Sequence, residues 1–156
     1  TGLTHVSIPS LNSDLVENKN EVNSHVLIVE DNMDNQVLFK AYLKNQKLNL
    51  HFANDGKEAI EMFSKQKFDL IYMDLQMPNV NGYEATKEIR AIESKNANSL
   101  KTPIIALTAF TNKNELEAAL EVGCDSYLVK PIKKVQLIAD INERLQSKLL
   151  NQSKVS

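Results

Sequence analysis

The chain has 156 residues, which is enough for one domain with a full hydrophobic core and too short for two ordinary domains. Hydrophobic residues make up 42% of the sequence, as in globular proteins, and a net charge of -2 leaves no basic excess for a large nucleic-acid surface. No apolar run approaches the roughly 20 residues that cross a bilayer, and no signal peptide is apparent. The composition therefore predicts a globular domain that itself contacts neither nucleic acid nor membrane.

The two ends of the chain differ from its middle. Residues 1–24 are rich in Asn, Ser, Asp and Glu without a sustained hydrophobic period, so we expect a flexible linker or tail there. The first residue is Thr1 rather than Met, which suggests that the chain was cut from a longer one. We expect the folded domain at residues 25–148 and a C-terminal tail at residues 149–156.

The single cysteine, Cys124, has no partner for an internal disulfide bond. Its neighbours include no Lys, Arg or His that would make the thiol reactive, so we expect a small buried thiol. Unpaired cysteine is typical of a reducing compartment, and we expect a cytoplasmic protein.

Short apolar segments alternate with amphipathic segments along the domain. The apolar or alternating segments predict five β-strands, at residues 26–29, 48–52, 70–73, 104–107 and 127–129. Apolar residues at helical spacing predict five helices, at residues 34–46, 59–63, 85–92, 116–120 and 135–145, the last of which can run on to residue 149. Strands that alternate with helices form right-handed parallel βαβ units, so we expect an α/β sheet between two layers of helices.

Several details of the helices are also predicted. Asn32 or Asp34 can cap the first helix, and Gly123 ends the fourth. The polar loop at residues 94–102 is longer than most connections, and we expect it to be mobile and without a role. The expected apolar faces are Val37, Leu38, Ala41 and Tyr42 on the first helix, Leu116, Ala119 and Leu120 on the fourth, and Val135, Ile138, Ile141 and Leu145 on the last.

Polar side chains follow four of the predicted strands. Asp74 ends the third strand, Glu30 and Asp31 follow the first, Thr108 ends the fourth, and Lys130 follows the fifth. Because the carboxyl ends of parallel strands meet at one edge of a sheet, where ligand crevices lie, we expect these five side chains to converge.

The combination favours phosphoryl transfer. Three carboxylates held together repel one another, and a hard cation with oxygen ligands, such as Mg²⁺, relieves that repulsion. Thr108 adds a hydroxyl donor and Lys130 a positive charge around a tetrahedral anion attached at Asp74. Asp74 is then the nucleophile and forms an aspartyl phosphate.

Each of these residues has an ordinary structural alternative. Glu30 and Asp31 can cap the following helix, Thr108 can be a turn hydroxyl, and Lys130 can be a solvated surface lysine. Tyr127 can be a half-buried strand aromatic. Their joint occurrence at matched strand ends favours the functional interpretation.

Five segments carry a family resemblance, in chain order: residues 26–32 (VLIVEDN), 73–78 (MDLQMP), 82–86 (GYEAT), 104–109 (IIALTA) and 127–131 (YLVKP). In these segments the chain resembles the receiver domain of two-component response regulators and is most similar to receivers of hybrid sensor histidine kinases. The resemblance implies a flavodoxin-like doubly wound (βα)5 sandwich with a five-stranded parallel sheet in the order 2-1-3-4-5.

The resemblance also implies a role for each acidic residue. Asp74 accepts a phosphoryl group from a phosphohistidine. Asp31 and Asp74 bind Mg²⁺ directly, the backbone carbonyl of Gln76 adds a ligand, and Glu30 assists through water. Mn²⁺ can take the place of Mg²⁺.

The remaining site residues follow in the same way. Thr108 and Lys130 bind the phosphoryl oxygens, and Tyr127 is the aromatic switch that follows Thr108 when phosphate is bound. The output is a shift between two conformations of one face of the domain. Phe110 lies two residues past Thr108, and we expect its apolar side chain to limit water access to the acyl phosphate.

The implied partner is a histidine kinase or a histidine phosphotransfer domain, with the chain itself a monomer or weak dimer. We expect the C-terminal receiver of a hybrid histidine kinase, which can be membrane-anchored, and the alternative is a stand-alone response regulator. No segment after residue 148 has the size of a DNA-binding output domain, which argues against a transcription factor unless the chain is a fragment of one. The domain assists its own phosphorylation without being a turnover enzyme, so enzyme status depends on the parent chain.

Three other classes of protein were weighed. A pseudo-receiver that acts only in protein interaction has no need of Asp74, Asp31, Thr108 and Lys130 together. A flavodoxin-like electron carrier needs a hydroxyl- and Gly-rich phosphate loop after the first strand, where this chain has acidic residues. A haloacid-dehalogenase-like phosphatase needs a second Asp two residues after the nucleophile, and that position is Gln76.

Overall fold

The computed structural model describes residues 23–96 and 100–155, with side chains as far as Gln146. The predicted linker therefore lies almost entirely outside the described residues, as do residues 97–99 of the predicted polar loop. Within the described part of the chain, no helix combines the length and the apolar character needed to cross a membrane.

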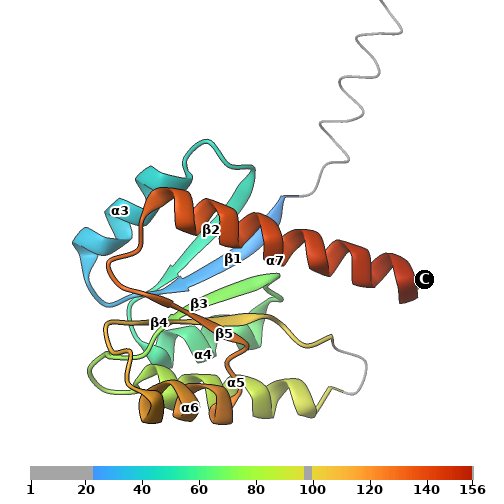
Figure 1. Ribbon diagram of the computed structural model, residues 1–156. Helices are drawn as coiled ribbons and strands as arrows, with labels where there is room; N and C mark the ends of the chain where they lie inside the picture. Colours follow the sequence, from blue (N-terminus) through green and yellow to red (C-terminus); the bar gives the residue numbers. More distant parts are fainter. Residues whose placement is uncertain (1–22, 97–99, 156) are drawn as a thin grey trace, which may run out of the picture.

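Five parallel strands form one sheet in the order β2-β1-β3-β4-β5, which confirms the predicted flavodoxin-like order (Figure 1). The strands are β1 (Ser24–Val29), β2 (Leu48–Ala53), β3 (Leu70–Asp74), β4 (Ile104–Thr108) and β5 (Ser126–Val129). Met73 pairs with Val29 on one side and with Ala106 on the other, and Thr108 pairs with Val129. The strands that precede the predicted site residues therefore end at the same edge of the sheet.

Helices cover both faces of this sheet (Figure 1). Helices α3 (Met33–Leu43) and α7 (Lys134–Val155) pack on one face, and α4 (Gly56–Lys65), α5 (Gly82–Ser94) and α6 (Lys113–Val122) pack on the other. Strands β3 and β4 are buried along their whole length, because both of their faces meet a helical layer.

The helices begin where a short polar side chain can bind the free N–H groups of the first turn. Asn32, Asp55, Asn81 and Asn112 each accept a hydrogen bond from the backbone N–H three residues later, at 2.8–3.0 Å. Asn32 is therefore the cap of α3, one of the two predicted candidates. Helix α6 ends at Gly123, whose φ of 118° lies in the left-handed region that favours glycine.

The apolar face predicted for the first helix is confirmed at Tyr42, which packs against the core, and is wrong at Val37, Leu38 and Ala41, which are exposed. Val37 and Leu38 are 60% and 43% exposed, whereas Phe39 and Leu43 are buried in the core with Gln36. The helix also ends at Leu43, three residues before the predicted end. Apolar residues occur on two faces of this helix, and the periodicity alone does not say which of them meets the sheet.

The last two helices show the same kind of correction. Leu120 on α6 is 49% exposed and Val135 on α7 is 80% exposed, although both were predicted on the core face. Leu137 occupies the core position on α7 instead, together with Ile141. The backbone of α7 is helical to Val155, so the helix includes most of the residues predicted as a C-terminal tail.

At the edge where strands β4 and β5 begin, one arginine joins three segments. Arg90 on α5 donates two hydrogen bonds to the Gly123 carbonyl, at 2.9 and 3.0 Å, and one to the Thr102 carbonyl at 2.8 Å. It also forms ion pairs with Glu93 and Asp125, at 2.7 and 3.0 Å. These contacts fasten the starts of β4 and β5 to α5.

Candidate functional site

Asp74 lies at the carboxyl end of β3, buried with 1% of its surface exposed. Its Oδ1 accepts a hydrogen bond from the Gln76 backbone N–H at 3.1 Å, so the chain turns tightly around the carboxylate. The loop then returns so closely that a Cβ on Gly82 would lie 2.2 Å from the Asp74 carbonyl oxygen. Only glycine fits at Gly82, and its place in the sequence follows from this approach.

Glu30 follows β1 and is also buried, with 1% exposed. Its Oε2 accepts a hydrogen bond from the Asn32 backbone N–H at 3.1 Å, and this contact turns the side chain toward the sheet edge. The next residue, Asp31, is exposed to solvent. The first strand therefore supplies one shielded carboxylate and one that solvent can reach.

A buried amide holds the backbone of Glu30 in place. Gln36 Nε2 donates to the Glu30 carbonyl at 2.7 Å and to Asn54 Oδ1 at 2.8 Å, and so ties the loop after β1 to the loop after β2. Sequence reasoning gave Gln36 no role. Its spacing of three residues from Phe39 places it on the buried helix face, where a polar side chain requires partners.

Three carboxylates and one ammonium group converge at this edge, as predicted. Ligand oxygens of Glu30, Asp31 and Asp74 lie within 4.8 Å of one another. Lys130 Nζ lies 2.9 Å from Asp74 Oδ2 and 3.1 Å from Glu30 Oε1. The cluster keeps a net negative charge with hard oxygen donors, and this donor set fits a divalent cation such as Mg²⁺.

The electrostatics of the pair follow from burial and proximity. Burial raises the pKa of Asp74 from its ordinary 3.8 to about 6, although the hydrogen bond and charge of Lys130 oppose that rise. Burial also acts to lower the pKa of Lys130, but the hydrogen bonds and charges of Asp74 and Glu30 outweigh it and raise the pKa overall. Lys130 thus places its ammonium group between the carboxyl groups of Asp74 and Glu30.

Thr108 and Tyr127 also lie at this end of the sheet, but within the described part of the chain neither side chain forms a hydrogen bond with the carboxylates. Thr108 is fully buried, and its Oγ1 accepts a hydrogen bond from the Phe110 N–H at 3.0 Å and donates to the Phe110 carbonyl at 3.2 Å. Tyr127 pairs with Ala106, two residues before Thr108, and is 39% exposed. Both side chains therefore lie on the same face of neighbouring strands.

The fold and this cluster agree with one family of proteins. The family model of the response regulator receiver domain matches residues 26–142, and the chain belongs to that family. A relative in Schizosaccharomyces pombe, response regulator mcs4, is 36% identical over 76% of this chain and 27% of its own length. Hybrid signal transduction histidine kinase I of Dictyostelium discoideum is 40% identical over 77% of this chain and 7% of its own length. The chain thus spans about a quarter or less of the length of these relatives.

Solved structures give the same result. The receiver domain of Saccharomyces cerevisiae Ssk1, crystallised with the histidine phosphotransfer protein Ypd1, has a TM-score of 0.77 and 34% identity, covering 82% of this chain and 94% of that one. The receiver domain of the Pseudomonas aeruginosa sensor histidine kinase PA1611 has a TM-score of 0.71 and 34% identity, covering 80% and 99%. That structure contains a magnesium ion coordinated in the active-site cleft.

Proposed function

We propose that the chain is the phosphoacceptor receiver of a two-component phosphorelay, in which Asp74 takes a phosphoryl group from a phosphohistidine. One observation carries the proposal: Lys130 Nζ lies within hydrogen-bond distance of both Asp74 and Glu30, in a cluster that Asp31 completes. Phosphoryl transfer is catalysed mainly by positioning and by neutralising charge, and this cluster offers both.

In the proposed transfer, a carboxylate oxygen of Asp74 attacks the phosphorus atom. The P–N bond to the donor imidazole breaks, the imidazole takes a proton from water, and an acyl phosphate forms on Asp74. Lys130 moves its ammonium group toward the phosphoryl oxygens while it stays near Asp74. With a pKa of about 6, Asp74 is mostly ionised at neutral pH, as a nucleophile must be.

The residues also suit a metal-assisted reaction. Asp31 and Asp74 would hold Mg²⁺ directly, with the backbone carbonyl of Gln76 as a further ligand and Glu30 acting through water. Mn²⁺ can take the same place. The bound ion would neutralise charge on the carboxylates and on the phosphoryl oxygens.

The proposed switch begins at Thr108. Its hydroxyl leaves the backbone of Phe110 and binds a phosphoryl oxygen, and Tyr127 then moves on the same face of the sheet. The exchange of one set of hydrogen bonds for another gives two states that phosphorylation can bias.

The proposed partner is a histidine kinase or a histidine phosphotransfer domain, docked beside Asp74 with its histidine facing the carboxylate. Met33, Val37 and Leu38 on α3 are 61%, 60% and 43% exposed, and α3 starts directly after the loop that carries Asp31. Exposed apolar residues next to a reactive site suit a protein interface. The crystallised pairing of Ypd1 with a similar receiver supports the same class of partner.

We further propose that the parent chain is a hybrid histidine kinase in the cytoplasm, with this domain at its C-terminus. The identity to the Dictyostelium hybrid kinase supports this origin, while the identity to mcs4 supports a separate response regulator as the alternative. The complete coding sequence of the parent gene distinguishes the two, and fractionation of cells that express it tests the location.

The phosphoacceptor proposal is tested with Mg²⁺ and acetyl phosphate, and intact mass is measured. We expect a gain of one phosphoryl group that hydroxylamine removes, that requires Mg²⁺ and that is absent from Asp74→Asn. Beryllofluoride, a phosphoryl mimic, is expected to shift NMR signals near Thr108 and Tyr127. No phosphorylation and no Mg²⁺-dependent shifts would instead favour a pseudo-receiver that acts only in binding.

A further inference from the structure

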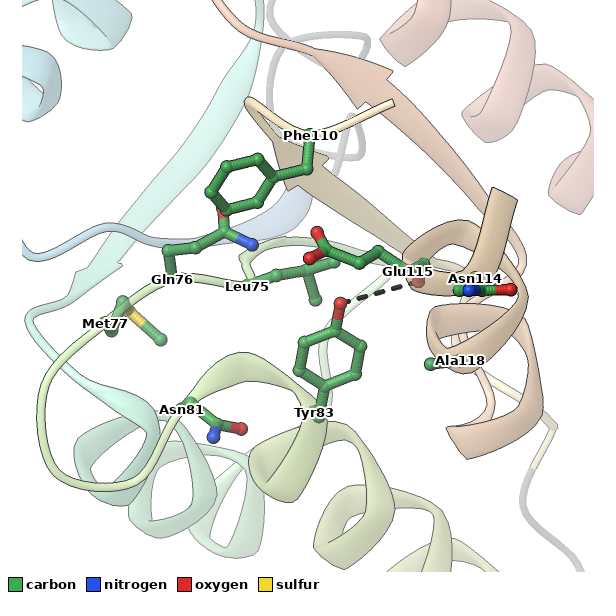
Figure 2. Close-up of a pocket in the computed structure, with 9 residues that line it drawn as sticks. All are labelled: Leu75, Gln76, Met77, Asn81, Tyr83, Phe110, Asn114, Glu115 and Ala118. Atoms are coloured by element: carbon green, nitrogen blue, oxygen red, sulfur yellow. Dashed lines mark hydrogen bonds between the residues drawn. The ribbon is translucent and has the colours of Figure 1, made fainter. Parts of the chain in front are cut away.

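A pocket of 420 Å³ lies beside the phosphoacceptor, between the loop after β3, the loop after β4 and the first turns of α5 and α6 (Figure 2). Leu75 and Met77 form its buried apolar floor, with 2% and 8% exposed. The rings of Phe110 and Tyr83 stand on opposite sides of it. A volume of this size lies within the roughly 300–1,000 Å³ that is typical of binding sites.

The pocket has a carboxylate at its centre. Glu115 extends from the first turn of α6 into the space between Phe110 and Tyr83 (Figure 2). Its Oε2 is shielded from solvent and has no hydrogen-bond partner within the described part of the chain. The Tyr83 hydroxyl donates to the backbone carbonyl of Glu115 at 3.4 Å and not to the carboxylate.

Within the pocket, compensation of this carboxylate is limited to the N-terminal end of α6, because Glu115 lies in the first turn of that helix. Among the residues that line the pocket, none carries a positive charge, since the remaining polar groups are the amides of Gln76, Asn81 and Asn114 and the Tyr83 hydroxyl. A shielded carboxylate oxygen without a hydrogen bond raises the free energy of the protein, and a cationic donor lowers it again. The pocket therefore selects for a positive charge.

We propose that this pocket receives the side chain of an arginine from a protein that docks at the phosphorylation edge. The guanidinium group would pair with the Glu115 carboxylate and stack against Phe110 or Tyr83, while the amide oxygens beside it accept its outer N–H groups. Arginine fits better than lysine because its planar group stacks on aromatic rings and offers several donors in a fixed geometry.

The shape of the pocket favours a side chain over a free small molecule. Phe110 is 47% exposed on its rim, so a small ligand would keep much of its own surface in water. A side chain delivered by a docked protein is covered by the rest of that protein. The identity of that protein as the phosphodonor depends on the proposed function, whereas the affinity of the pocket for the cation does not.

The position of the pocket links it to the site. Gln76, on its wall, donates its backbone N–H to Asp74, and Phe110 holds the hydroxyl of Thr108 through its backbone. A side chain bound here would contact both loops that carry the phosphoacceptor chemistry. A change in either loop on phosphorylation would therefore change the affinity of the pocket for the partner's side chain.

The test compares two isosteric probes by NMR on the ¹⁵N-labelled chain. N-acetyl-L-arginine methylamide carries the guanidinium group, and N-acetyl-L-citrulline methylamide replaces it with a neutral urea. We expect saturable shifts at Tyr83, Phe110 and Glu115 with the arginine probe, with a Kd on the order of 1–10 mM, and at most weak shifts with the citrulline probe.

Two variants complete the test. Glu115→Gln is expected to weaken binding of the arginine probe by about tenfold, because a charged acceptor becomes neutral. Glu117→Gln is the matched control: it changes the same charge on the same helix, and the Glu117 side chain is 56% exposed and pairs with Lys113 at 3.9 Å. We expect this control to bind as the unmodified chain does.

Three results would overturn the proposal: no saturable binding, equal binding of both probes, or equal loss of binding in Glu115→Gln and Glu117→Gln. The comparison of the two probes uses the unmodified chain and does not depend on how either variant folds. The titration contains neither Mg²⁺ nor a phosphodonor, so a negative result would not affect the phosphoacceptor proposal. Conversely, a failure of phosphorylation would not affect the proposal that the pocket binds a guanidinium group.

Discussion

Thr108 and Phe110 are joined twice, since the Thr108 hydroxyl accepts a hydrogen bond from the Phe110 N–H at 3.0 Å and donates one to its carbonyl at 3.2 Å. The hydroxyl that is proposed to bind phosphate is therefore already satisfied in the unphosphorylated chain. In the proposed switch, phosphorylation exchanges these two hydrogen bonds for new ones, so the loop after β4 would change together with Thr108. The two hydrogen bonds between Thr108 and Phe110 would thus couple phosphorylation of Asp74 to the conformation of the exposed loop after β4.

Phe110 is expected to control the lifetime of the acyl phosphate. Its ring and Gln76 both line the pocket beside Asp74 (Figure 2), and an apolar group there limits the approach of water. Phe110→Glu should therefore speed dephosphorylation several-fold, as measured by the loss of phosphate from the phosphorylated protein over time. Phe110→Leu serves as the apolar control and should lose phosphate more slowly than Phe110→Glu. Equal rates of dephosphorylation in the two variants would show that Phe110 does not limit the access of water to the acyl phosphate.

Asp74 is expected to make stability depend on pH. Because its pKa is raised from 3.8 to about 6 in the folded chain, the folded state binds a proton between these pH values that the unfolded chain has released. Stability from this group is therefore present at about pH 4 and is lost as the pH rises through 6. Asp74→Asn removes this titration. As the pH rises from 4 to 7, the free energy of unfolding of the variant should therefore increase by about 1–3 kcal/mol relative to that of the unmodified chain.

Urea unfolding at the two pH values, without metal, measures this difference. Added Mg²⁺ should stabilise the unmodified chain at pH 7 and should have much less effect on Asp74→Asn, because binding to the folded state alone raises stability. A variant whose stability follows the same pH curve as the unmodified chain would show that Asp74 titrates normally.

Gln36 is expected to stabilise the loop after β1, which carries Glu30 and Asp31. Gln36→Ala leaves the buried Glu30 carbonyl and the Asn54 side chain each without one donor, at a cost of about 1–3 kcal/mol in the free energy of unfolding. Because Glu30 is then held less firmly, the variant should also bind Mg²⁺ more weakly. Asn45→Ala, at an exposed position beyond the same helix, is the control. Unchanged Mg²⁺ binding in a destabilised Gln36→Ala would limit Gln36 to a purely structural role.

Tyr72 is expected to hold α7 against the strand that carries Asp74. The Tyr72 hydroxyl donates to Asp140 Oδ2 at 2.7 Å in the buried interior, and Asp140 also lies 3.5 Å from Arg144 Nε. Tyr72→Phe should lower the free energy of unfolding by about 1–3 kcal/mol, because a buried carboxylate oxygen loses its donor. In an Asp140→Asn background the same substitution should cost clearly less. Equal costs in both backgrounds, measured by a double-mutant cycle, would show that the pair does not interact.

The carboxylate cluster could be predicted from the residues that end a buried strand, whereas the strand order was predicted through the resemblance to receiver domains. The sequence was not sufficient for the faces of the helices. Val135 and Leu137 are both apolar and two positions apart on α7, yet one is 80% exposed and the other 1%. The choice between them is made by the packing of α7 on the sheet, which no local pattern contains. The roles of Gln36 and Glu115 depend in the same way on loops that meet only after folding.

Arg90 gives the two ends of the sheet different mechanical properties. Its hydrogen bonds to the Gly123 and Thr102 carbonyls hold the starts of β4 and β5 in place, whereas the loop after β4 changes its hydrogen bonds in the proposed switch. The end of the sheet where β4 and β5 begin is therefore held rigidly, and the opposite end is expected to be more mobile. Hydrogen exchange should be slow at the amides of Ile104 and Asp125 and faster around Phe110, and phosphorylation should alter only the faster set.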